Sequence, residues 1–121
     1  MNLFDASALL AFLQDEDGAD IIEEQLLRGG VCSAVNWSET AQKLLAHDLD
    51  WELCRGLLLT YELEVVPVQA ADAEAAARMW KRRSGLSIAD RLCLATGQRL
   101  DATVWTADTV WDTSDRTRQI R

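Results

Sequence analysis

The sequence predicts an α/β protein, a three-layer α/β/α sandwich around a short, mostly parallel, doubly wound sheet. Short apolar runs typical of buried strands alternate with longer helical patterns along the chain. Apolar residues make up 49% of the 121 residues and there is one proline, which indicates a folded chain with a real core. Because crossovers between parallel strands are right-handed, this alternation favours a doubly wound sheet. We expect residues 1–121 to form a single domain.

The predicted elements follow in chain order. Strands are expected at residues 1–4, 31–32, 63–68 and 103–105, with a short last strand at 119–120. Helices are expected at residues 8–13, 19–28, 33–47, 50–61 and 72–83, then from Ser87 onward, with one helical turn at 109–112. The expected N-caps are Ser7, Ser33, Asp50 and Ser87, and Gly29-Gly30 ends the second helix.

Three of the helices show apolar positions at helical spacing, and these are expected to face the core. The sets are Ile21, Ile22, Leu26 and Leu27; Ala34, Trp37, Ala41, Leu44 and Leu45; and Leu53, Leu57 and Leu58. Glu39 lies roughly opposite the middle set, which favours a solvated position, although the same side chain could point into a cleft.

Acidic residues interrupt segments that otherwise look buried. Asp5 closes the first strand, Asp108 follows the fourth, and Asp90 lies within the apolar segment 88–95. Ligands of doubly wound sheets bind beyond the carboxyl ends of the strands, where Asp5 and Asp108 would converge if their strands are neighbours. Each acid also has an ordinary explanation. Asp90 would complete a capping box with Ser87, and aspartate is common in turns.

Several carboxylates near a core are costly unless a cation compensates them. Oxygen-only ligands suit Mg²⁺ or Mn²⁺, and such ions can activate water for phosphodiester hydrolysis. The sequence therefore favours hydrolysis of nucleic acid at a site built from these acids. Whether one ion or two would bind, and whether Asp112 contributes, stays open.

Composition limits the other functions. The three cysteines are isolated in apolar segments, which is typical of a reducing cytoplasm, and one histidine leaves little material for a zinc site or a catalytic triad. No apolar stretch is long enough to cross a bilayer. The net charge of −8 argues against a non-specific nucleic-acid binder, but bound divalent ions would neutralise part of it.

One basic run, at residues 79–83, has two interpretations. Lys81, Arg82 and Arg83 could stabilise the end of a helix, which is the favoured interpretation, or contact RNA phosphates near the cleft. Arg91, next to Asp90, could pair with a site carboxylate or contact substrate.

Four segments together resemble the motifs of PIN domains, in particular VapC-type toxins of toxin–antitoxin pairs. They are residues 5–10, 33–39, 86–95 and 106–108, and their order and spacing cover essentially the whole chain. The resemblance implies a Mg²⁺- or Mn²⁺-dependent endoribonuclease, usually a homodimer, inhibited by a VapB-type antitoxin. It makes Asp5, Glu39, Asp90 and Asp108 the metal-binding acids, with Ser7 and Thr106 as supporting residues.

Two other functions remain as alternatives. A phosphoacceptor signalling domain also carries strand-end aspartates, but it needs a late lysine, and the last lysine here is Lys81. A non-catalytic metal-binding module would bind Mn²⁺ without cleaving nucleic acid.

Overall fold

The computed structural model describes residues 1–111 and 116–121. Its sheet has five parallel strands in the order β3-β2-β1-β4-β5. The strands are β1 (Asn2–Phe4), β2 (Val31–Ser33), β3 (Glu64–Val66), β4 (Thr103–Thr106) and β5 (Thr117–Gln119). The chain winds from β1 to β3 in one direction and through β4 to β5 in the other. The predicted doubly wound α/β class is confirmed, and the winding reverses between β1 and β4.

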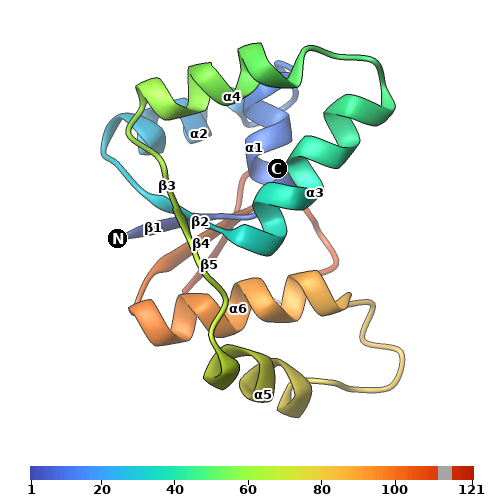
Figure 1. The fold of residues 1–121 in the computed structure, drawn as a ribbon. Coiled ribbons are helices and arrows are strands. Elements are labelled where there is room, and N and C mark those ends of the chain that lie inside the picture. Colours follow the sequence, from blue (N-terminus) through green and yellow to red (C-terminus); the bar gives the residue numbers. More distant parts are fainter. Residues whose placement is uncertain (112–115) are drawn as a thin grey trace.

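Six helices occur in the described residues, and they form the two outer layers. They are α1 (Ala6–Leu13), α2 (Ala19–Leu27), α3 (Ala34–Ala46), α4 (Trp51–Thr60), α5 (Ala70–Arg78) and α6 (Ile88–Leu100). Helices α1, α2 and α4 lie on one side of the sheet and α5 and α6 on the other (Figure 1). Helix α3 contacts both α1 and α6, so it joins the layers at one end of the sheet. None of these helices has the length and apolar character needed to span a membrane.

Strand alternation divides the core between the two faces of the sheet. Leu3 belongs to the cluster on the α6 side, whereas its neighbour Phe4 belongs to the cluster on the α1 side. Val31 and Cys32 divide in the same way. All four are buried, as expected for strands covered on both faces.

The buried helix faces are narrower than the apolar pattern predicts. On α2, Ile22 is fully buried, but Ile21 is 37% and Leu27 72% exposed. On α4, Leu58 is buried, whereas Leu53 and Leu57 are exposed. Successive helical residues point about 100° apart, so adjacent apolar residues do not share one contact stripe. The predictions for these exposed residues were wrong.

Helix α3 follows the predicted face only in part: Leu44 is buried and Trp37 packs against the core, but two polar residues are buried beside them. Its buried residues are Asn36, Thr40 and Leu44, while Ala34 and Leu45 are exposed. Asn36 and Thr40 are polar, so the apolar periodicity of the helix does not predict that they are buried. Thr40 satisfies its hydroxyl by donating to the Asn36 carbonyl at 2.8 Å.

Two boundaries on the C-terminal half differ from the prediction. Helix α5 ends at Arg78, five residues before the predicted end, and Arg83 adopts a left-handed φ of 61° in the loop that follows. Residues 109–111 form a turn and a bend instead of the predicted helical turn, whose last residue, Asp112, lies outside the described residues.

Candidate metal centre

The site begins where β1 and β4 end side by side. Phe4 is paired with Trp105, and the Asp5 amide donates to the Trp105 carbonyl at 3.1 Å. Asp5 and Thr106 therefore emerge together at the carboxyl edge, where the winding reverses. The predicted neighbour relation between these two strands is confirmed, and it creates the crevice in which ligands of such sheets bind.

Asp5 is the buried centre of this edge. It is 4% exposed, and its side chain accepts three hydrogen bonds: Oδ1 from Ser7 Oγ at 2.7 Å and the Ala8 amide at 2.8 Å, and Oδ2 from Thr106 Oγ1 at 2.6 Å. Asp5, not Ser7, is thus the N-cap of α1, and the predicted cap was wrong. A carboxylate offers about four acceptor positions, so one position on Oδ2 remains for a cation.

Ser7 and Thr106 hold the Asp5 carboxylate in place. Their hydroxyl oxygens lie 3.2 Å apart, and each also accepts a backbone amide, Ser7 from Ala107 at 2.9 Å and Thr106 from Asp108 at 3.0 Å. Because each hydroxyl hydrogen points at Asp5, the two residues orient this carboxylate and connect it to the segment that carries Asp108.

The electrostatics of Asp5 indicate an acidic neighbourhood. The pKa of Asp5 is raised from 3.8 to about 6, mainly by burial and to a smaller extent by the charge of Asp90, against the lowering effect of its three hydrogen bonds. The ionised carboxylate is therefore penalised at neutral pH, and a bound cation would relieve that penalty.

Asp90 has the capping role that the sequence allowed. Its amide donates to Ser87 Oγ at 3.1 Å, and the Ser87 amide donates to Asp90 Oδ2 at 3.0 Å, so the capping box is present. Within the described residues, Oδ1 takes part in no hydrogen bond. Asp90 can therefore start helix α6 and still offer an oxygen to a ligand.

Glu39 is held by a polar chain that the sequence analysis missed. Ser33 Oγ donates to Asn36 Oδ1 at 2.7 Å, and Asn36 Nδ2 donates to Glu39 Oε1 at 2.9 Å. Ser33 and Asn36 are buried, and Glu39 is half-buried, so it is not the fully solvated residue that periodicity favoured. The signal available in the sequence was the asparagine three residues before this glutamate, on the same face of the helix.

The pKa of the buried Cys93 thiol reflects how these acids are distributed. Burial raises this pKa well above its usual value, and the charges of Asp5, Asp90 and Glu39 all raise it further. The three carboxylates are therefore all close enough to Cys93 for their charges to affect its pKa. Even so, no group of three or more histidine, cysteine or acidic side chains is arranged as a metal site in the part of the chain that the structure describes.

Asp108 lies at the margin of this cluster. Its Oδ1 accepts the Val110 amide at 2.9 Å, which forms a tight turn after β4, and its own amide donates to Thr106. The residue is half-buried. The structure therefore brings Asp108 to the same edge through Thr106, two residues away.

The predicted basic residues divide into two groups. Lys81, Arg82 and Arg83 are exposed and lie beyond the end of α5, so the favoured interpretation as helix-stabilising cations was wrong. Arg91 donates to the Ala76 carbonyl at 2.9 Å and thereby attaches α6 to α5. In the described residues it pairs with no site carboxylate.

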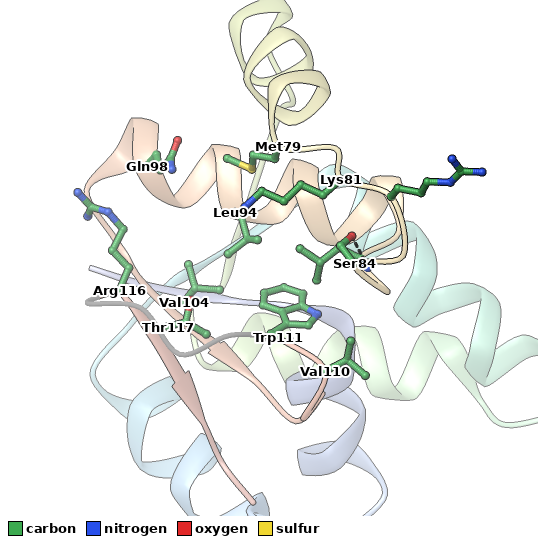
Figure 2. A pocket seen from close by; sticks show the side chains of 12 residues that line it. Met79, Lys81, Ser84, Leu94, Gln98, Val104, Val110, Trp111, Arg116 and Thr117 are labelled. Atoms are coloured by element: carbon green, nitrogen blue, oxygen red, sulfur yellow. Dashed lines mark hydrogen bonds between the residues drawn. The ribbon is translucent and has the colours of Figure 1, made fainter.

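A cleft of about 510 Å³ lies beside the basic loop. Its apolar lining includes Leu86, Leu94, Val104, Val110 and Trp111. Figure 2 shows Lys81 and Ser84 on one side of it and Val110 and Trp111, from the segment after Asp108, on the other. The cleft thus lies between the segment that precedes Asp90 and the segment that follows Asp108.

Comparisons with known proteins agree with this architecture. No curated protein sequence matches the chain. The solved structure "Toxin-antitoxin complex from Klebsiella pneumoniae" contains a chain with the same fold, with a TM-score of 0.78 at 16% sequence identity over 100% of this chain and 98% of that one. The family model of the PIN domain matches residues 3–116. The chain belongs to the PIN domain family.

Proposed function

We propose that this protein is a Mg²⁺- or Mn²⁺-dependent endoribonuclease and the toxin of a type II toxin–antitoxin pair, with residues 1–121 forming one PIN domain. The observation that carries the proposal is the buried Asp5 at the β1–β4 crevice, held by Ser7 and Thr106 and lying close enough to Asp90 to be affected by its charge. An acid so placed is costly without a cation, which supports a metal-dependent site.

The proposed metal ligands are Asp5, Glu39, Asp90 and Asp108. All four offer carboxylate oxygens, the donor type that Mg²⁺ and Mn²⁺ prefer. A divalent ion bound there would supply Lewis acidity toward water and a phosphodiester. Ser7 and Thr106 would keep Asp5 oriented, and the Ser33–Asn36 pair would keep Glu39 in place.

The proposed partners are RNA as substrate, a VapB-type antitoxin as inhibitor and a second copy of the chain in a homodimer. The similar structure described as a toxin–antitoxin complex supports an antitoxin partner. Exposed leucines on α2 and α4, among them Leu27, Leu53 and Leu57, provide apolar surface for such contacts. The three free cysteines support action in the cytoplasm.

The test compares two variants that separate metal binding from helix capping. Asp90→Asn removes a charge from the site, whereas Ser87→Ala removes the cap of α6 and leaves the carboxylate. We expect Asp90→Asn to reduce metal-dependent RNA cleavage by at least about a hundredfold. Ser87→Ala should lower stability by about 1 kcal/mol and retain most of the activity.

The outcome distinguishes the alternatives. Full activity in Asp90→Asn would remove this residue from the site. Manganese binding without cleavage of RNA or DNA would favour the non-catalytic module. Stable labelling by a phosphoryl donor would favour the phosphoacceptor domain. Growth arrest on expression, relieved by co-expression of the neighbouring small gene, would support the toxin role.

A further inference from the structure

We propose that the loop between α5 and α6 is a binding subsite for single-stranded RNA, in which Trp80 stacks on a base and Lys81, Arg82 and Arg83 contact the adjacent phosphates. The inference rests on the proposed function, because it specifies how the substrate is held next to the acid cluster. Three properties of this loop support it: its exposure, its charge and its anchoring.

Trp80 differs from the other tryptophans in its exposure. It is 62% exposed, whereas Trp111 is buried and Trp37 and Trp51 pack edge to face with ring centroids 5.0 Å apart. Trp105 donates its indole hydrogen to Asn2 at 3.0 Å. The other four tryptophans are packed or partly buried, so the exposed indole of Trp80 is the one available as a stacking surface in the part of the chain that the structure describes.

The charge next to Trp80 is opposite to that of the molecule. The chain has a net charge of −8, yet three of its twelve lysines and arginines are consecutive at Lys81, Arg82 and Arg83. All three residues are exposed, and in the described part of the chain none forms an ion pair. Since no ion pair among the described residues occupies these cations, they can bind phosphate.

The loop is anchored between the two segments that carry site acids. The Ser84 amide donates to the Lys81 carbonyl at 3.3 Å, and the Leu86 amide donates to Ser84 Oγ at 3.3 Å. Gly85 has a φ of 77°, and a Cβ there would lie 2.7 Å from Val110 Cγ1. The loop therefore rests on the turn after Asp108 and leads directly into the helix that carries Asp90.

Together these features favour a single strand over a duplex. An indole can stack on an unpaired base of any sequence, whereas the bases of a duplex are already stacked. The neighbouring cations would follow the strand backbone. A strand bound in this way would pass from the loop toward the crevice that contains Asp5 and Asp90.

The test measures binding of the full chain without cleavage. Fluorescence anisotropy in EDTA would use a labelled single-stranded uridine RNA, a duplex RNA of the same length, and heparin, which has charge but no bases. Trp80→Ala should weaken binding to the single strand roughly tenfold and leave heparin binding unchanged. Leu45→Ala, which changes an exposed leucine on α3 outside the proposed contact surfaces, is the matched control and should change neither.

The charge contribution is tested separately through salt dependence. Changing Lys81, Arg82 and Arg83 to glutamine should reduce the slope of log affinity against log salt by roughly 0.7 for each phosphate that is no longer neutralised. Lys43→Gln with Arg55→Gln removes exposed cations from other helices and should leave the slope unchanged.

Several results would overturn the subsite. The first is equal affinity of the unchanged protein for duplex and single-stranded RNA. The second is single-strand binding by Trp80→Ala that equals that of the unchanged protein. The third is a loss of heparin binding in Trp80→Ala as large as its loss of single-strand binding. If the loop variants lost binding to an acidic protein partner but kept their binding to single-stranded RNA, the loop would be assigned to that partner instead. Binding is measured without metal, so it is independent of cleavage. If Trp80→Ala binds single-stranded RNA as tightly as the unchanged protein, and the unchanged protein cleaves RNA when metal is added, the subsite is refuted and the proposed function stands.

Discussion

At the scale of single residues, Asp5 combines a structural and a proposed chemical role. Its Oδ1 caps α1 through the Ala8 amide at 2.8 Å, while Oδ2 faces Thr106 and keeps an acceptor position. Asp90 likewise uses one oxygen to complete the capping box that Ser87 begins at the start of α6. Capping and metal binding are therefore compatible at both positions, since a carboxylate has two oxygens.

The raised pKa of Asp5 predicts a pH-dependent stability of the metal-free protein. Burial raises this pKa from 3.8 to about 6, so the folded state binds the proton more tightly than the unfolded state. The resulting stability is present below about pH 4 and is lost as pH rises to about 6, a difference of about 3 kcal/mol. We expect urea unfolding in EDTA to show this loss.

The variant Asp5→Asn tests whether Asp5 causes this pH dependence of the stability. Asp5→Asn has no titrating group at this position, so its stability should change less across the same pH range than that of the unchanged protein. Identical pH profiles of the two proteins would show that Asp5 is not the responsible group.

At the scale of elements, close packing of α6 on β4 positions the acidic end of that helix. A Cβ at Gly97 would lie 2.6 Å from Val104 Cγ2, so only glycine permits this approach. On the other side of α6, Arg91 reaches the Ala76 carbonyl, and Arg99 pairs with the buried Asp72 at 2.9 Å. The orientation of α6, and with it of Asp90, is thus set along its whole length.

Two alanine substitutions should have opposite effects on stability. Gly97→Ala overpacks the α6–β4 contact, which typically costs about 1–3 kcal/mol and outweighs the gain in helix propensity. Gly56→Ala lies in α4 with no atom within 4 Å of the new Cβ, so it should stabilise the protein by up to about 1 kcal/mol. Thermal and urea unfolding would measure both, and stabilisation by Gly97→Ala would contradict the packing argument.

At the scale of the whole molecule, the winding of the sheet assembles the candidate site. The acids come from the end of β1, from α3, from the start of α6 and from the turn after β4. Helix α3, which carries Glu39, contacts both α1, which Asp5 caps, and α6, which carries Asp90 in its first turn. The negative charge of the crevice would favour a divalent cation over a single positively charged side chain.

Metal binding at this crevice should stabilise the folded protein. A ligand that binds only the folded state at about a hundred times its Kd adds about 2.7 kcal/mol of stability. We expect Mn²⁺ to raise the melting temperature of the unchanged protein and of Glu74→Gln, which alters an exposed acid on α5. The increase should be largely absent in Asp5→Asn, and an equal increase in all three proteins would indicate non-specific binding.

Features that depend on residues close together in the chain could be predicted from the sequence. The caps Ser33, Asp50 and Ser87 were predicted and are confirmed, because each bonds an amide only three residues away. The order of strands and helices could also be predicted, because local hydrophobic patterns depend on residues that are close together in the chain. The family resemblance named Glu39, which periodicity alone would have left in solvent.

The surroundings of the acids depend on contacts between residues that are far apart in the chain. Asp5 caps α1 through a local bond to Ala8, but its other oxygen is held by Thr106, 101 residues later in the chain. Ser33 and Asn36 hold Glu39 on a face that no apolar pattern marks, and the basic loop is placed by the contact of Gly85 with Val110. These contacts arise from the pairing of β1 with β4 and from helix packing, which a local pattern does not encode.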